Sequence, residues 1–384
     1  MSLIPAGSVI STILKHDSKQ TSYKIALLRA INDIVLMFPD LRNSNQAVAI
    51  PLRMLAERWV AYYWPFVQRD CSIWQGPRSF RDGVLRSDLS FRASLTILRE
   101  QWEHLNRGLG KPSDGFFIVN ELRVPRKRQT YPVSLLEAYD ITISAIRRTI
   151  EQPIRYAGAG EWSVFDRPTR LDRLEATVVA VPSSRPHERC VVVSAELWQT
   201  FQSMSLWVEA LCIHEWCLFS ETVDEQAERG HIYSLLTDRP DNRRPLTWER
   251  NKIDLLILEG HTFICPWTHR EITPGVAYDL DHLMPVSIYP INELWNLVPA
   301  DPKFNSHVKR DRLPTIERLQ QAQPYFELAY SQYSASESLS DVLREDAEIR
   351  FSQLQQDLFA ASLAHAVADF IEQVAETRNL SRFG

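Results

Sequence analysis

Paired cysteines are missing from this sequence. Its 384 residues contain five cysteines, an odd number, and no two of them form a CxxC pair. Small oxidised domains usually carry an even set of cysteines, so this usage excludes a disulfide scaffold and favours a reducing compartment. We therefore expect a cytoplasmic protein.

Long apolar runs are missing too. No uninterrupted apolar stretch approaches the roughly 18 residues that a membrane-spanning helix requires. The first residues, MSLIPAGSVISTILKHDSK, contain a brief apolar run that Pro5 and Gly7 interrupt, with no basic segment before it. This pattern is not typical of a signal peptide. We expect neither a membrane span nor a leader.

The chain has no excess of positive charge. Its formal net charge is −5, so it does not coat nucleic acid through overall charge, and any contact with a polyanion must come from local patches. The GxxxxGK[ST] signature of nucleotide-hydrolysing motors is also absent, so we expect any such motor to lie on another polypeptide.

Helical periodicity dominates the first half. Apolar residues recur every three or four positions, the spacing by which an amphipathic helix buries one face. The pattern predicts helices over 22–38, 51–64, 91–105 and 136–150. The fold class that we predict is mainly α with a small α+β part.

Other segments carry different signals. ATVVAVPSSRPHERCVVVS, within 174–194, predicts two strands joined in a hairpin, and Ser194 then caps a helix. TDRPDNRRP, at 237–245, is turn-rich and basic and predicts a linker. Past residue 320, YSQYSASESLSD predicts a polar spacer before a further helix.

Polar and basic residues gather between residues 278 and 314. This stretch reads YDLDHLMPVSIYPINELWNLVPADPKFNSHVKRDRLP. We predict a strand ending at Asp281-His282, a loop through Tyr289-Pro290, a strand at Trp295–Val298 and a helix over about 302–310. Together these elements form a ββα unit. Because side chains alternate along a strand, Asp281 and His282 point to opposite sides.

These residues resemble the HNH, or ββα-metal, endonuclease family, which includes the HNH domains of CRISPR nucleases and of restriction enzymes. The resemblance extends from about Phe263 to Pro314 and includes the order Asp281-His282, Asn296 and Asn305. It implies that Asp281 and Asn305 bind a metal ion and that His282 is the general base. Asn296 matches the middle asparagine of the motif, which bridges loop and strands by hydrogen bonds.

His307 is an alternative to Asn305 for the last position of the motif. Residues two positions apart on a helix point about 200° away from each other, so only one of Asn305 and His307 can face the metal. The spacing favours Asn305. We expect the other polar side chains of this region to contact nucleic acid, together with a second basic run in the first half: Lys303, His307, Lys309, Arg310 and Arg312, with Arg126, Lys127 and Arg128.

The implied ion is Mg²⁺ or Mn²⁺, because a carboxylate and an amide oxygen form a hard oxygen site. Many family members also have a zinc knuckle made from two CxxC pairs. Here the corresponding places read Cys265-Pro-Trp-Thr268 and Asp301-Pro-Lys-Phe304. One thiolate cannot build a tetrahedral zinc site, so we expect no structural zinc. We expect Trp267, Trp295 and Phe304 to brace the unit by packing.

The predicted organisation has four parts. Residues 1–170 form a helical domain, 171–245 a connecting region of hairpin plus helix, 246–320 the HNH nuclease domain and 321–384 a C-terminal helical segment. We expect the larger helical region that precedes the nuclease domain to select the target or to control when cleavage occurs.

The predicted function is that of a metal-dependent DNA endonuclease that leaves a 5′-phosphate and a 3′-hydroxyl. One such centre cuts one strand, so a double-strand break requires a homodimer or two sequential nicks. The resemblance implies a role in bacterial restriction or anti-phage defence, together with other proteins. Two alternatives stay open, namely a non-catalytic nucleic-acid-binding or scaffold protein and an RNA-cleaving effector.

Overall fold

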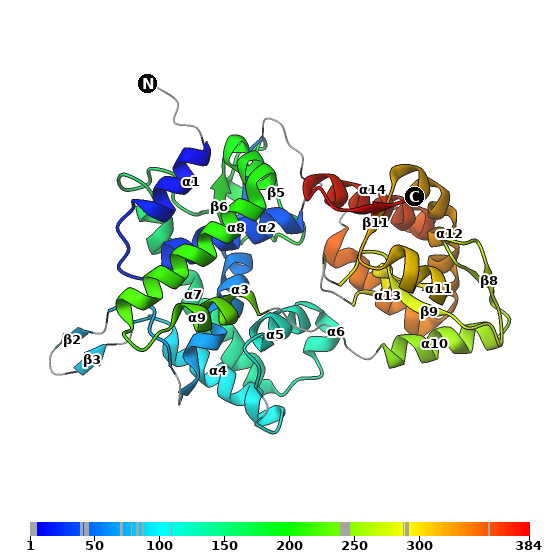
Figure 1. Ribbon diagram of the computed structural model, residues 1–384, viewed down its shortest axis with the longest axis horizontal. Coiled ribbons are helices and arrows are strands. Elements are labelled where there is room, and N and C mark those ends of the chain that lie inside the picture. Colours follow the sequence, from blue (N-terminus) through cyan, green and yellow to red (C-terminus); the bar gives the residue numbers. More distant parts are fainter. Residues whose placement is uncertain are drawn as a thin grey trace. The chain divides into compact units, whose positions relative to one another are not determined.

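The chain divides into two compact units, residues 1–240 and 241–384, which are called unit 1 and unit 2. The computed structural model describes residues 6–38, 41, 46–69, 72–77, 79–81, 84–86, 88–108, 110–238, 246–286, 288, 292–351 and 354–384. Each unit has its own hydrophobic core. Helices dominate both units and the sheets are small (Figure 1). The predicted fold class, mainly α with a small α+β part, is confirmed.

Unit 1 is built from helices around α2, which buries most of its residues. Helices α2 and α8 pack against each other, as do α3 and α7. The four helices predicted in this half correspond to α2, α3, α4 and α7. The helical elements of unit 1 are α1 (Ala6–Lys15), α2 (Tyr23–Met37), α3 (Leu52–Tyr63), η1 (Trp64–Val67), α4 (Arg92–Leu105), α5 (Asp114–Arg123), α6 (Pro125–Arg128), α7 (Val133–Tyr156), η3 (Leu171–Arg173), α8 (Ala195–Val223) and α9 (Arg229–Thr237).

A four-stranded sheet in unit 1 has the order β4-β6-β1-β5. Its strands are β1 (Val48–Pro51), β4 (Thr169–Arg170), β5 (Val179–Ala180) and β6 (Arg189–Val193), and a separate pair is β2 (Ser79–Arg81) with β3 (Val84–Arg86). The predicted hairpin over 174–194 is wrong, because β1 lies between its two strands and pairs with both. The buried residues of β1 come from more than 120 positions earlier in the chain, so local pattern could not reveal the insertion.

The sequence predicted a separate connecting region over residues 171–245. In the structure, unit 1 extends to residue 240 and so includes most of this region. Its strands complete the sheet around β1, and α8 contributes buried residues to the unit 1 core. Ser194 caps α8 as predicted, accepting a hydrogen bond from Leu197 N at 3.3 Å. The predicted linker falls on residues 237–245, of which 239–245 lie outside the described residues.

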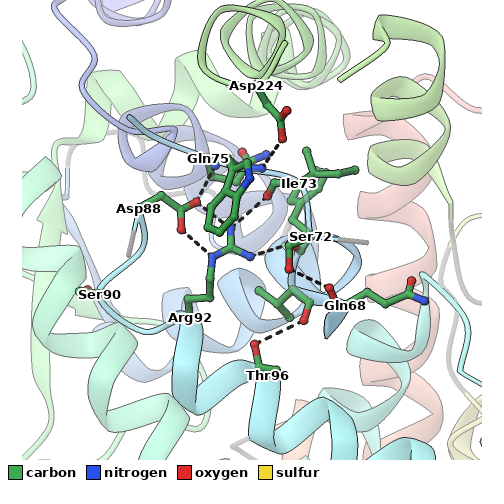
Figure 2. A network of polar contacts seen from close by, with 12 residues as sticks. Gln68, Ser72, Ile73, Gln75, Asp88, Ser90, Arg92, Thr96 and Asp224 are labelled. Carbon is green, nitrogen blue, oxygen red and sulfur yellow. Dashed lines mark hydrogen bonds and ion pairs between the residues drawn. The ribbon is translucent and has the colours of Figure 1, made fainter. Parts of the chain in front are cut away.

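A buried polar network ties α4 to the segment after η1 (Figure 2). The Arg92 guanidinium donates to both carboxylate oxygens of Asp88, at 2.5 and 2.6 Å, and to the carbonyl oxygens of Phe66 and Ile73. The Gln75 backbone N–H donates to the same Asp88 carboxylate at 2.6 Å. The side chains of Asp88 and Arg92 are both buried. The hydrogen bonds of this ion pair therefore take the place of the hydration that each charged group has in the unfolded chain.

Unit 2 surrounds two short antiparallel strands with helices. The strands are β9 (Asp279–His282) and β10 (Leu297–Ala300), paired so that His282 lies opposite Leu297. The remaining elements are α10 (Thr247–Leu258), β7 (Phe263–Ile264), β8 (Glu271–Ile272), η4 (Leu294–Asn296), α11 (Pro302–Phe304), the π-helical turn η5 (Asn305–Lys309), β11 (Leu313–Pro314), α12 (Ile316–Ala335), α13 (Glu337–Arg350), η6 (Gln356–Leu358), α14 (Phe359–Thr377) and β12 (Arg382–Phe383).

The predicted polar spacer YSQYSASESLSD is wrong. These residues form the end of α12 and the start of α13, and two of their tyrosines are fully buried. Tyr330 Oη donates to Trp295 O at 2.6 Å, and Tyr333 Oη donates to Leu297 O at 2.9 Å. Their spacing of three puts both hydroxyls on one face of α12. Residues 321–384 therefore share one core with the ββα unit, as β11 pairing with β12 also shows.

Helix α14 lies within a segment that has the length and composition of a membrane span. Among the described residues, Gln356–Thr377 is the one helical segment that reaches this apolarity, and half of its window is buried inside the protein. The buried residues of α14 pack against α12 in the core of unit 2. A core helix has the same composition, so length and apolarity alone decide nothing here.

Candidate active site

The two faces of β9 carry different chemistry. Asp279 and Asp281 alternate with Leu280 and His282 along the strand, so the two carboxylates share one face and the imidazole lies on the other. Asp281 is buried, with 4% of its surface exposed, whereas Asp279 and His282 are half-buried. The strand thus presents two oxygen ligands on one side and a titratable nitrogen on the other.

The Asp281 carboxylate is occupied on both oxygens by protein donors. Lys309 Nζ donates to Asp281 Oδ1 at 2.9 Å, and Trp267 Nε1 donates to Asp281 Oδ2 at 3.1 Å. Lys309 Nζ also donates to the carbonyl oxygen of His282 at 2.7 Å. The Lys309 side chain is 1% exposed, so its ammonium is a buried counter-ion rather than a surface charge.

Asn305 faces Asp279, not Asp281. Its Nδ2 donates to Asp279 Oδ2 at 3.2 Å. The amide oxygen of Asn305 takes no part in this hydrogen bond. The position of Asn305 depends on Asp301, whose carboxylate accepts from Lys303 N and Phe304 N at the start of α11. These backbone hydrogen bonds, together with Arg270, lower the pKa of Asp301. Asp279 was missed from the sequence, although its position two residues before Asp281 puts it on the same strand face.

A π-helical turn separates Asn305 from Lys309. Its defining bond runs from Arg310 N to Asn305 O at 2.9 Å, an i→i+5 pattern that accommodates one more residue than an α-helical turn. Arg310 ends the turn with φ 53° and ψ −120°, a positive φ that costs a non-glycine residue about 1 to 3 kcal/mol. The predicted helix over 302–310 is therefore a short α-helix followed by this turn.

His282 is held through one ring nitrogen. Its Nε2 lies 2.7 Å from Asn292 Oδ1, a carbonyl-type acceptor, so Nε2 carries the proton and Nδ1 is the basic nitrogen of the neutral ring. Burial lowers the pKa of His282 below its usual 6.5, and Lys309 acts in the same direction. Asn292 and Asp281 oppose this shift without reversing it. The loop residues Tyr289 and Pro290 lie outside the described residues.

Asn296 joins the end of β9 to the start of β10. Its Oδ1 accepts from Met284 N at 2.8 Å and its Nδ2 donates to Met284 O at 3.1 Å. The Asn296 carbonyl oxygen also accepts from Leu283 N at 2.8 Å. The side chain is fully buried and its two amide atoms are both used in this way, so the residue frames the site and does not face a substrate.

The residues of unit 2 that were predicted to contact nucleic acid differ in how far they are exposed. Lys303, His307 and Arg310 are exposed, and Arg312 is half-buried with its guanidinium bonded to the carbonyl of Val308. Lys309 was predicted to contact phosphate, but its ammonium is buried against Asp281 in this structure. The lysine side chain is buried, with Asp281 as its carboxylate partner.

The basic run in unit 1 is largely neutralised by carboxylates. Arg128 donates to both oxygens of Asp140 at 2.8 Å, and Lys127 lies 3.5 Å from Glu121. Arg126 is half-buried at the same turn. The contact of these side chains with nucleic acid stays a prediction, at a turn where two of the three cations already have carboxylate partners.

Packing braces the position where many family members bind zinc. Cys265 is buried, and its Sγ accepts from Asp301 N at 3.2 Å. Trp267 packs edge-on against Phe326 and Phe383, and Phe304 packs against the same Phe383. Ring contacts thus connect the turn between β7 and β8 with α12 and β12.

Trp295 forms a second such contact group deeper in unit 2. It packs edge-on against Phe351 and Phe370, at centroid distances of 5.2 and 6.0 Å. Its Nε1 donates to Glu293 Oε2 at 2.6 Å. The indole therefore connects η4 with α14.

Comparison with known families assigns the two units separately. A family described as a domain of unknown function, DUF8808, matches residues 5–236, which is more than half of the chain. The chain belongs to the DUF8808 family. A second model, described as HNH endonuclease, matches residues 265–315. No curated protein and no solved structure matches the chain.

The HNH match falls on the ββα unit described above, including β9, β10 and η5. Unit 2 therefore contains an HNH-family domain, and this domain indicates a nuclease, that is, a hydrolase acting on nucleic acid. The DUF8808 match falls within unit 1. The description of this family names no activity.

The oxygen donors of this domain fit a divalent cation. Asp279, Asp281 and Asn305 supply two carboxylates and an amide on one side of the strand pair, and Mg²⁺ needs only one or two protein carboxylates besides water and phosphate. Among the described residues, no group of three or more His, Cys, Asp or Glu side chains is placed to hold a metal ion. The HNH match indicates a divalent metal ion in general, and these oxygen atoms are the side-chain donors on β9 and η5 that could hold it.

Proposed function

We propose that this DUF8808 protein is a metal-dependent DNA endonuclease whose HNH domain hydrolyses phosphodiester bonds. The products are a 5′-phosphate and a 3′-hydroxyl, and each active site cuts one strand. The observation that carries the proposal is the placement of His282. It lies on β9 next to Asp281, across the strand from the carboxylates, with Nε2 held by Asn292.

The protein's own groups divide the chemistry between them. Nδ1 of His282 removes a proton from the attacking water, and Asn292 keeps the ring in the tautomer that leaves this nitrogen free to act as the base. The hydrogen bond to Asn292 also stabilises the imidazolium that forms. Asn305 and the carboxylates of β9 would hold Mg²⁺ or Mn²⁺, and the ion would supply positive charge to neutralise the scissile phosphate and the departing 3′ oxygen.

The exposed cations near the site support a polyanionic substrate. Lys303 and Arg310 flank η5 and are exposed, and His307 lies between them. Their side chains can reach phosphates of the backbone, a contact that positions nucleic acid but does not read its sequence. Because the net charge of the chain is −5, such binding depends on local groups of cations like this one.

The biological role that we propose is restriction or anti-phage defence in the bacterial cytoplasm. The resemblance of the motif to such nucleases supports it. A double-strand break would require a homodimer or two nicks. Plaque counts on bacteria that express wild type or His282→Ala test this role, and equal counts would contradict it.

Plasmid cleavage tests the activity itself. Supercoiled DNA is incubated with the full chain in Mg²⁺, Mn²⁺ or EDTA, and a single-stranded RNA of matched length is assayed in parallel. We expect nicked circles with either cation, none with EDTA, and a loss of about 10²-fold or more in His282→Ala. His365→Ala is the matched control, since this exposed histidine lies on α14 and pairs with Asp369 of the same helix. DNA left intact in every lane would reject the proposal.

A further inference from the structure

An internal ammonium lies where the resemblance expects a metal ion. Lys309 Nζ is 2.9 Å from Asp281 Oδ1 and 2.7 Å from His282 O. Neither partner of the ion pair has more than 4% of its side chain exposed. The carboxylate that the motif assigns to the metal is therefore already neutralised by the chain itself.

The π-helical turn brings the ammonium there. Asn305 opens η5 and Lys309 closes it, so their side chains reach the two carboxylates of the same β9 face. Arg310, which ends the turn, has a strained positive φ of 53°. Strain of this kind persists only where surrounding contacts enforce it, and the buried ion pair is one such contact.

A divalent cation and this ammonium cannot share Asp281 at low cost. Both are positive, the site is shielded from water, and like charges repel strongly in such surroundings. An Asp281 carboxylate that lacked Lys309 would be a buried anion without a counter-ion, which is the condition that favours binding of a metal ion. Asp279, half-buried beside Asn305, is not restricted in this way.

We propose that Lys309 is a built-in counter-cation that competes with the divalent ion for Asp281, so that this ion pair lowers the affinity of the nuclease site for the metal ion. The inference rests on the proposed function and adds a control to it. Asp279 and Asn305 form the part of the site that is open in the resting protein. Asp281 joins them when Lys309 withdraws.

Binding of Mn²⁺ to the full chain tests this directly. Free Mn²⁺ is titrated by its electron paramagnetic resonance signal against wild type, Lys309→Met and Lys303→Met. We expect Lys309→Met to bind Mn²⁺ at least about tenfold more tightly than wild type, since the variant removes the competing charge. Lys303→Met removes an exposed charge from the neighbouring helical turn and controls for net charge alone. Equal affinities of wild type and Lys309→Met would overturn the proposal.

Two further variants protect the test against misfolding. Lys309→Gln keeps an N–H donor for Asp281 and His282 O without the charge, and it replaces Lys309→Met if circular dichroism shows the latter unfolded. The double variant Lys309→Met, Asp281→Asn should lose the gain in affinity. As a second measurement, Mn²⁺ should raise the Tm of the charge-free variant more than that of wild type. An equal rise in both proteins would contradict the inference.

Plasmid cleavage in the same Mn²⁺ series separates the two proposals. If wild type cuts DNA and the charge-free variant gains no affinity, Lys309 is a structural ion-pair partner and only this inference fails. If no protein in the series binds Mn²⁺ and none cuts, the proposed function fails with it.

Discussion

Asn292 Oδ1 lies 2.7 Å from His282 Nε2, so the loop before η4 holds the imidazole of β9. The two residues are ten positions apart, one at the end of β9 and the other shortly before η4. Asn292 is not a residue of the motif that carries the resemblance. The orientation of the proposed base therefore depends on a side chain outside that motif.

Replacing Asn292 should slow cleavage without abolishing it. Asn292→Ala removes the acceptor that fixes the His282 tautomer, so we expect kcat to fall by about 10-fold to 100-fold, less than in His282→Ala. KM for plasmid should change little, because Asn292 has no exposed charge to offer a phosphate. Steady-state nicking rates check this, and a KM effect with unchanged kcat would contradict an orienting role.

The acid limit of cleavage should lie below pH 6.5. Burial lowers the pKa of His282 from its usual 6.5, and a general base works only in its neutral form. As pH falls through the lowered pKa, the ring becomes protonated and kcat/KM declines. Asn292→Asp adds an anion beside Nε2, raises that pKa and should shift the limit to higher pH. The test is a pH profile of both proteins, and a wild-type limit above pH 6.5 would refute this assignment.

Asn296 should matter for stability rather than for chemistry. Asn296→Ala leaves the N–H and carbonyl groups of buried Met284 without their partners, which should cost about 2 to 5 kcal/mol. Native-state hydrogen exchange of the β9 and β10 amides measures this loss in the full chain. Asn251→Ala, at an exposed position of α10, is the matched control and should leave protection unchanged. Full protection in Asn296→Ala would show that water replaces the amide.

The Asp88–Arg92 pair should stabilise unit 1 alone. Asp88→Ala leaves a buried guanidinium without its carboxylate, which should lower the stability of unit 1 by about 3 to 5 kcal/mol. Asp140→Ala removes an exposed partner of Arg128 and should cost about 1 kcal/mol or less. Hydrogen exchange should show faster opening of α4 but not of α12, because the units have separate cores. Equal loosening of both helices would contradict this independence.

Local pattern in the sequence was enough for much of the fold. The helices over 22–38 and 91–105 and the cap at Ser194 depend on residues within a few turns of one another, so period and capping chemistry predict them. The strand ending at Asp281-His282 was predictable for the same reason. Alternation along that strand also separates the imidazole from the carboxylate without any knowledge of the fold.

Tertiary structure alone decided the partners of those residues. The pairing of Asn305 with Asp279, the burial of Lys309 against Asp281 and the insertion of β1 between β5 and β6 join residues 26 to 145 positions apart. Such contacts form only when packing brings distant segments together, so that the paired polar groups have a lower free energy in the folded core than when each is hydrated separately. Side-chain types and spacing specify what each residue can do, and the folded core determines which of those interactions it makes.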